Sequence, residues 1–140
     1  MIGWTYRKSF KTLSRLALCL TVLSLVGCGR SPTVEPALQG LVTDFEQLTG
    51  TSNSSDVLFV DSSDTKPWGV CSDGVVSINK HVWTLFTDTI WQRTILYHEL
   101  GHCNLGLKHV DDDQSFMRKA PPNFRTREEL EQSVLRAHRQ

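Results

Sequence analysis

The chain has 140 residues, which is enough for one compact domain and too few for two. Its 15 Lys and Arg balance 15 Asp and Glu, but four of the basic residues lie within residues 1–27. From Cys28 onward, 11 basic residues stand against 15 acidic ones, a net charge of −4. This balance argues against a nucleic-acid or anionic-lipid partner, because either would require a basic patch.

Residues 1–27 have the order of charged and apolar residues that is typical of an export signal. The basic residues come first: Arg7, Lys8, Lys11 and Arg15. An apolar run follows from Leu16 to Val26, shorter than the stretch of about 20 residues that a transmembrane helix needs. The run ends in Leu25-Val26-Gly27-Cys28, which resembles the lipobox of bacterial lipoproteins. An ordinary signal peptide with a chance cysteine, or a buried apolar helix, is the alternative.

The lipobox resemblance implies that the signal is removed before Cys28 and that this cysteine carries the lipid. Residues 28–35 would then be a short tether, and residues 36–140 would be the folded domain. Gly29 stands where an aspartate would indicate retention in the inner membrane. The resemblance therefore implies an exported protein that is anchored by its lipid to the bacterial membrane, on the periplasmic side of the outer membrane if the host is Gram-negative.

The folded domain begins with a predicted helix at residues 36–50, for which Gly50 is a suitable end. Its apolar residues share one face: Leu38, Leu41, Val42, Phe45 and Leu48. Residues 57–61 are predicted to form a short buried strand. Residues 68–79 predict a β-hairpin that turns at Ser72-Asp73-Gly74.

A long helix is predicted from Thr87 or Asp88 to about Gly106. A last helix is predicted to begin at a capping box formed by Thr126 and Glu129. The order of elements is thus helix, three short strands, helix, irregular turn, helix. This order predicts a small α+β domain.

The long helix has three sectors when its residues are placed at about 100° each. One sector combines two histidines with apolar neighbours: Trp91, Ile95, His98, His102 and Leu105. The opposite sector is apolar: Leu96, Leu100, Cys103 and Leu107. The remaining sector is expected to face solvent: Arg93, Tyr97, Asn104 and Lys108. We expect such a helix to lie between packed layers of the domain.

Two cysteines follow the lipobox, Cys71 in the predicted hairpin and Cys103 in the long helix. An exported protein meets an oxidising compartment, which favours a disulfide between them. Two small buried hydrophobic residues are the alternative. The phase of Cys103 directs it away from the histidines and towards the core, which favours the disulfide over a role as a metal ligand.

His98 and His102 are spaced i, i+4, so both imidazoles can hold one ion between them. Glu99 lies about 100° round the helix from His98, where a general base could take a proton from water beside that ion. A surface helix with two chance histidines is the alternative, and the helix phase argues against it. Gly101 lacks a side chain, so substrate or a neighbouring strand could come close there.

The pattern His98-Glu99-x-x-His102 resembles the zincin metallopeptidases, most closely the metzincin type, whose motif HExxHxxGxxH is followed by a Met-turn. The stretch HELGHC also resembles small bacterial lipoproteins that are regarded as metallopeptidases. The resemblance implies a minimal zincin-like fold, a bound Zn²⁺, Glu99 as catalytic base and hydrolysis of peptide bonds. It also implies that Met117 forms a Met-turn under the metal. A lone apolar residue in a loop is the alternative.

The chain departs from the metzincin pattern by one residue. Three residues separate His102 from Gly106 instead of two, whereas Gly106-x-x-His109 keeps the family spacing. Gly106 can adopt the left-handed conformation that turns the chain back, which favours His109 as the third zinc ligand. Three aspartates could replace His109 as an oxygen ligand: Asp111, Asp112 and Asp113.

In zincins of this type the substrate lies along the edge strand of the sheet, and residues 74–79 are the candidate here. Some relatives also have an oxyanion-stabilising tyrosine after the Met-turn. This chain has none there, because its two tyrosines are Tyr6 and Tyr97. Zinc itself or a basic residue such as Arg118 would then have to polarise the carbonyl.

We therefore expect a monomeric, lipid-anchored zinc metallopeptidase with a peptide or protein substrate. One alternative is a non-catalytic lipoprotein with a structural or vestigial zinc site, which the missing tyrosine and the altered spacing favour. Another is a zinc amidase that acts on cell-wall cross-links. It would share the same site and differ in the shape of the cleft.

Overall fold

The computed structural model describes residues 30–140, so the predictions for the signal segment and for lipid attachment at Cys28 lie outside the described residues. Ser31–Gln140 form one folded unit. None of the described helices has the length and apolar character that a membrane span requires.

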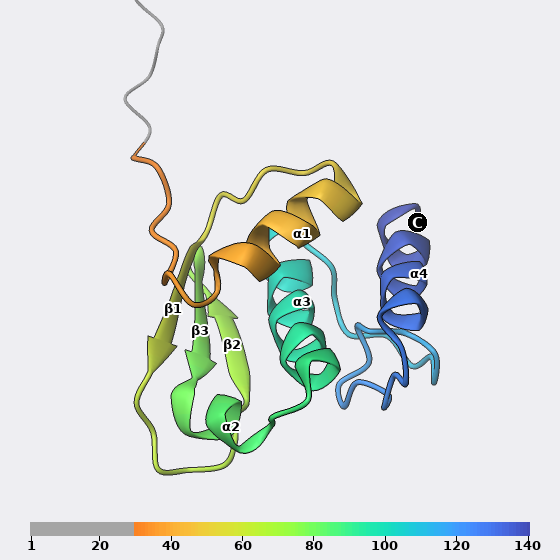
Figure 1. Cartoon of the computed structure of the whole chain (residues 1–140). Helices are drawn as coiled ribbons and strands as arrows, with labels where there is room; N and C mark the ends of the chain where they lie inside the picture. Colours follow the sequence, from red (N-terminus) through yellow and green to blue (C-terminus); the bar gives the residue numbers. More distant parts are fainter. Residues whose placement is uncertain (1–29) are drawn as a thin grey trace, which may run out of the picture. The chain divides into compact units, whose positions relative to one another are not determined.

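In the described part of the chain, four helices and three strands form a mixed α+β fold, which confirms the predicted α+β class (Figure 1). They are, in chain order, α1 (Gln39–Thr49), β1 (Asp56–Val60), β2 (Gly69–Ser72), β3 (Val75–Asn79), α2 (Lys80–Leu85), α3 (Thr89–Leu105) and α4 (Arg127–His138). The short helix α2 was not predicted from the sequence. Asn79 caps this short helix, because its side-chain oxygen accepts a hydrogen bond from the Val82 amide at 3.2 Å.

The three strands form one sheet in the order β1-β3-β2, with β1 parallel and β2 antiparallel to β3. Asp73 and Gly74 make the predicted turn between β2 and β3, with φ angles of 51° and 75°. The prediction that residues 74–79 form the edge strand was wrong, because β3 is the central strand. The two edges are β2 and β1, and beyond β1 an isolated bridge joins Val34 to Val57.

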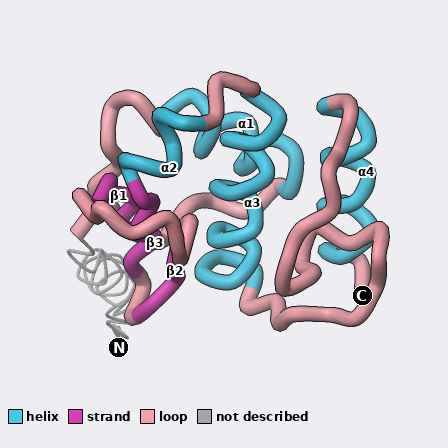
Figure 2. The backbone as a smooth tube through the Cα atoms, turned by 90° about the horizontal axis from the view of Figure 1, so that it is seen from below, coloured by secondary structure: helices cyan, strands magenta, loops and turns pink. Residues whose placement is uncertain are grey.

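Helix α3 lies between the sheet and α4, and α1 packs against it as well (Figures 1 and 2). Eight consecutive residues of α3, Thr94–Gly101, are buried. The prediction that the Tyr97 sector faces solvent was wrong, because α1 covers it. Tyr97 is 0% exposed, and its ring centroid lies 5.0 Å from that of Phe45. Arg93 of the same sector pairs with Asp44 of α1 at 2.7 Å.

Local caps determine where α3 begins and ends. The Asp88 side chain accepts a hydrogen bond from the Ile90 amide at 2.8 Å, close to the predicted start. Gly106 ends the helix in the left-handed conformation, with φ 64°. The Leu107 amide then donates to the Gly101 carbonyl at 3.0 Å. The chain therefore turns back against α3 directly after the helix.

Helix α4 begins at the predicted capping residue, with one difference. The Thr126 hydroxyl accepts a hydrogen bond from the Glu129 amide at 3.2 Å. The Glu129 carboxylate accepts from the Arg125 amide at 2.8 Å rather than from Thr126 itself. The N-terminal cap thus extends one residue further back than the usual capping box.

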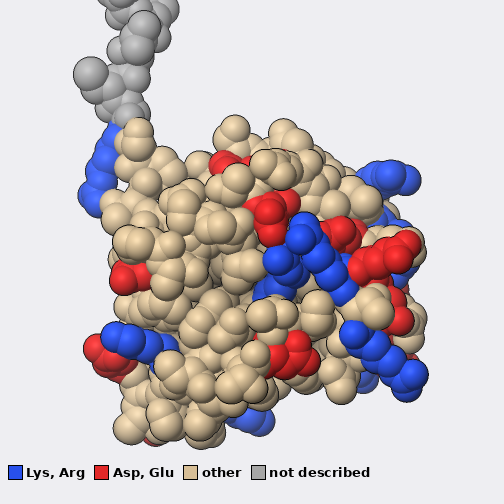
Figure 3. Space-filling view, in the orientation of Figure 1, with Lys and Arg blue, Asp and Glu red and all other residues tan. Residues whose placement is uncertain are grey.

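Acidic and basic side chains are interspersed on the face of the described residues that Figure 3 shows. Asp44 of α1 pairs with Arg93 of α3 at 2.7 Å and lies 3.6 Å from Arg127 of α4. This group of charges links the three helices, while the sheet lies on the other side of α3.

Candidate metal centre

Three histidines converge at the end of α3. His98 and His102 come from the helix, and His109 comes from the segment that follows the Gly106 turn. Their Nε2 atoms lie 3.1 Å (His98 to His109), 3.2 Å (His98 to His102) and 3.2 Å (His102 to His109) apart. The helix continues through the extra residue, and the Gly106 turn brings His109 back to the other two. These three residues could hold a metal ion.

Backbone carbonyls orient the two helical histidines. The Nδ1 of His98 donates to the Phe116 carbonyl at 2.7 Å, and the Nδ1 of His102 donates to the Leu107 carbonyl at 2.7 Å. A carbonyl only accepts, so both Nδ1 atoms carry a proton, and in the neutral form of each ring Nε2 presents a lone pair towards the other histidines. Lone pairs at 3.2 Å repel each other unless a cation lies between them.

The donor set fits a tetrahedral ion with an open position. Zinc–nitrogen bonds of about 2.0–2.1 Å at tetrahedral angles would separate the ligand nitrogens by roughly 3.3 Å. The Nε2 separations of 3.1–3.2 Å are close to this value. Three imidazoles leave a fourth position for water or substrate, as in catalytic rather than structural zinc sites.

The three aspartates after His109 lie outside this group of ligands. All three are exposed. Asp112 accepts a hydrogen bond from the Gln114 amide at 2.9 Å, and Asp113 pairs with Arg118 at 3.1 Å. The geometry therefore favours His109 over an aspartate as the third ligand.

Glu99 lies in the same cleft as the histidines and is only 8% exposed. Burial raises the pKa of its carboxyl to about 7, and a hydrogen bond from the Cys71 backbone counteracts part of this rise. Its side chain lies against Gly69 of β2, where an added Cβ would come within 2.7 Å of the Glu99 Cγ. A carboxyl with this pKa can both take up and release a proton near neutral pH.

Met117 packs directly against the helical segment between the two histidines. It is 1% exposed, and an added Cβ at Gly101 would lie 2.6 Å from its Sδ and 3.0 Å from the Phe116 ring. Gly101 therefore makes room for the loop that contains Met117, and not for a strand. Met117 thus packs against α3 between His98 and His102, and its role as a Met-turn under a metal stays a prediction.

Ser133 of α4 supports the same loop, and the sequence analysis missed it. Its hydroxyl accepts from the Phe116 amide at 2.9 Å and donates to the Gln114 carbonyl at 2.8 Å. Phe116 in turn orients His98 through its carbonyl. The sequence feature that could have indicated this role is a polar residue on the apolar face of α4, between Leu130 and Val134.

A disulfide joins Cys71 of β2 to Cys103 of α3, which confirms the predicted pair. The Cα atoms of the two cysteines are 5.6 Å apart. The disulfide attaches the edge strand to the side of α3 that carries Cys103. Cys103 is therefore not a metal ligand.

The histidines and Glu99 open into a cleft of about 1060 Å³. Residues 66–71 form one wall, and α3 contributes Trp91, Thr94 and Ile95 next to the histidines. The rest of the lining comes from residues 109–111 and 118–121. Arg118, the basic residue that was considered beside zinc for polarising the carbonyl, thus lines the cleft, although its guanidinium pairs with Asp113.

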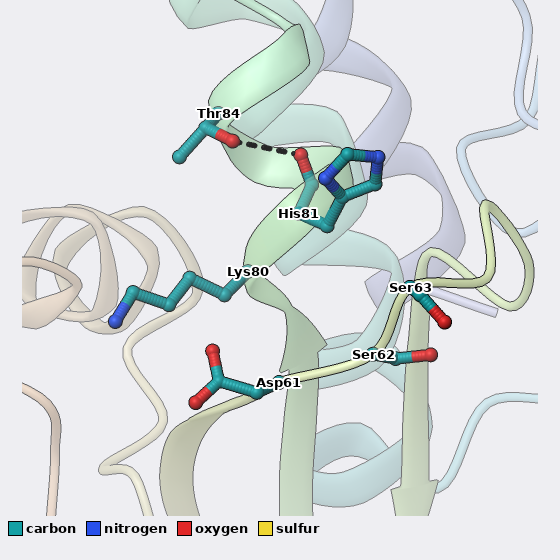
Figure 4. A pocket seen from close by; sticks show the side chains of 6 residues that line it. All are labelled: Asp61, Ser62, Ser63, Lys80, His81 and Thr84. Atoms are coloured by element: carbon teal, nitrogen blue, oxygen red, sulfur yellow. Dashed lines mark hydrogen bonds between the residues drawn. The ribbon is translucent and has the colours of Figure 1, made fainter.

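A second pocket of about 430 Å³ lies between the end of β1 and α2 (Figure 4). It is lined by Asp61, Ser62, Ser63, Lys80, His81 and Thr84. The Thr84 hydroxyl donates to the His81 carbonyl at 2.8 Å. This hydroxyl proton is therefore already used in a hydrogen bond within α2. Among the described residues, His81 does not belong to the group that could hold a metal ion.

Searches of protein family models, of curated proteins and of solved structures give no match to this chain.

Proposed function

We propose that this protein is a zinc-dependent metallopeptidase. One observation carries the proposal: three Nε2 atoms converge at 3.1–3.2 Å in a cleft that also holds a buried carboxyl, Glu99. The ligands are His98, His102 and His109. A zinc ion held by them would act as a Lewis acid that acidifies water and polarises a carbonyl oxygen.

Glu99 is the general base in this proposal. Its carboxylate takes a proton from the attacking water, whose oxygen forms a bond to the peptide carbonyl carbon. The protonated Glu99 then gives this proton to the leaving amine as the carbon–nitrogen bond breaks. The burial of this carboxyl in the same cleft as the three histidines supports its role as the base.

The edge strand β2 is the proposed binding place for an extended peptide. It pairs with β3 on one side only, and residues 69–71 line the cleft beside Glu99. A peptide that adds a strand to this edge would pass the histidines with its main chain held by hydrogen bonds. The proposed substrate-binding strand is therefore β2, and not residues 74–79, which the sequence had suggested.

The compartment is also part of the proposal. The Cys71–Cys103 disulfide is compatible with export to an oxidising compartment. Lipid attachment at Cys28 rests on the lipobox resemblance. We propose a monomeric enzyme on the membrane surface whose partners are peptide or protein substrates.

Substitution Glu99→Gln tests the proposal. The variant should keep about one zinc per chain and lose peptide hydrolysis by at least a hundredfold, because the amide cannot accept the proton. Zinc content is measured by mass spectrometry of the metal, and hydrolysis with a mixed peptide library. Equal hydrolysis by the variant and the wild type would exclude Glu99 as the base. A zinc-loaded wild type that cleaves no peptide would indicate a non-catalytic site.

A further inference from the structure

Two tryptophans line the metal cleft at the end distant from His109. Trp68 lies directly before β2, and Trp91 lies in the first turn of α3. Their ring centroids are 5.5 Å apart and their planes are nearly perpendicular, at 86°. The two indoles therefore form a corner with one wall on the edge-strand side and one on the α3 side.

Phe86 contacts both indoles of this corner. Its ring stacks on Trp91 at 5.5 Å with an angle of 18°, and contacts Trp68 edge-on at 5.8 Å. Trp68 and Phe86 pack against the hydrophobic core, whereas Trp91 does not belong to the set that does. Both tryptophans are only half-buried. Core packing thus explains Phe86 and Trp68, while Trp91 is positioned by its contacts with these two rings and lines the cleft.

Perpendicular indoles are suited to a flat apolar ring, which can stack on one and meet the other edge-on. We propose that Trp68 and Trp91 form a binding subsite for an aromatic side chain of the peptide substrate. This inference rests on the proposed peptidase function and names the kind of substrate that the cleft selects.

The helix geometry places the subsite along the substrate. Trp91 precedes His98 by seven residues, so both lie on one face of α3, about 10 Å apart along the axis. Ile95 lies between them and also lines the cleft. An extended peptide advances about 3.3 Å per residue. A side chain bound at the tryptophans therefore belongs to a residue about three positions from the bond that is cleaved.

The rest of the wall favours a peptide over a sugar chain. β2 pairs with β3 on one side only, so its outer main-chain groups can pair with an extended peptide, except for the Cys71 amide, which donates to Glu99. Val70 of this strand is 41% exposed and lines the cleft, as an apolar contact for a neighbouring side chain. A glycan would gain stacking on the indoles but could not continue the sheet.

Peptides of alanine and glycine, each with a single phenylalanine at successive positions, test the subsite. In the wild type, phenylalanine two to four residues from the cleaved bond should raise kcat/KM at least tenfold over the peptide without it. Trp91→Ala should bring this ratio close to one. Trp83→Ala is the matched control, because Trp83 packs on Phe59 and does not line the cleft, and it should keep the wild-type ratio.

Binding to the zinc-loaded Glu99→Gln variant separates this inference from the proposed activity. The phenylalanine peptide should bind at least tenfold more tightly than the alanine peptide by calorimetry, and adding Trp91→Ala should remove the difference. This result supports the subsite even if the wild type cleaves nothing. Cleavage without a phenylalanine preference would overturn the subsite and leave the peptidase proposal intact.

Two controls keep the result interpretable. Trp91→Leu is a milder substitution that keeps apolar volume, and it replaces Trp91→Ala if circular dichroism or zinc content shows that the latter is misfolded. An N-acetylglucosamine oligomer serves as the glycan probe. Tight binding of this oligomer that depends on Trp91, with no preference for phenylalanine, would overturn the assignment to a peptide side chain.

Discussion

His109 completes the histidine group although it is an exposed loop residue. His98 and His102 are held by α3 and by two carbonyls, so their positions do not depend on the metal. His109 depends on the left-handed turn at Gly106, which directs the chain back to the helix. His109 is therefore the proposed ligand whose position the extra residue in the motif could have changed.

We predict that His109→Ala loses about one zinc per chain, since two imidazoles alone hold zinc weakly. The measurement is the metal content of the purified domain after dialysis against a weak chelator. Asp112→Ala is the control and should keep its zinc, because Asp112 bonds the Gln114 amide instead. Zinc retained by His109→Ala and lost by an aspartate variant would reassign the third ligand.

Gly101 is a second position where a single residue determines how the loop packs against α3. We predict that Gly101→Ala destabilises the protein by about 1–2 kcal/mol, because overpacking against Met117 and Phe116 outweighs the roughly 1 kcal/mol gain in helix propensity. Both neighbours are at most 1% exposed and have no solvent to move into.

Urea unfolding measures this difference in stability. Gly40→Ala in α1 is the matched control, since no atom lies within 4 Å of its added Cβ, and it should be neutral or stabilising. If both substitutions change the free energy of unfolding equally, the loop that contains Phe116 and Met117 must shift to accommodate the new methyl group.

At the scale of the elements, α4 supports the candidate metal centre without contributing one of its histidines. Ser133 holds the amide of Phe116, the Phe116 carbonyl holds His98, and the Val110 amide donates to the Met117 carbonyl at 3.1 Å. The last helix and the two segments that flank residues 111–115 thus act as one support for the histidines.

We predict that Ser133→Ala weakens zinc binding about tenfold, because groups that orient a ligand typically contribute at least this factor. Competition with a fluorescent zinc chelator measures the dissociation constant. Gln132→Ala, on the exposed face of α4, should leave it unchanged. A lower unfolding stability of Ser133→Ala with unaltered zinc affinity would show a purely structural role.

At the scale of the whole molecule, the sheet and the helices meet at the cleft through β2. The strand is joined to α3 by Cys71–Cys103, and its main chain contacts Glu99. This one covalent link holds the proposed substrate edge and the proposed catalytic base together. A small domain gains more from such a link than a large one does.

We predict that the double substitution Cys71→Ala with Cys103→Ala lowers the free energy of unfolding by roughly 3–4 kcal/mol, as the chain-entropy account gives for a sequence separation of 32 residues. Urea unfolding of the oxidised wild type and the double variant gives the difference. The wild type under reducing conditions should approach the variant. Equal stability of all three would mean that packing alone holds β2 to α3.

Local signals in the sequence determined the ends of α3, the hairpin turn at Asp73-Gly74 and the spacing of the three histidines. Each depends on residues close together in the chain: a capping side chain, a glycine with positive φ, or a helical period. The tertiary structure alone decided that β2 is the edge strand, that α1 buries Tyr97 and that Ser133 supports His98. These features depend on contacts between distant segments, whose packing free energies no local pattern contains.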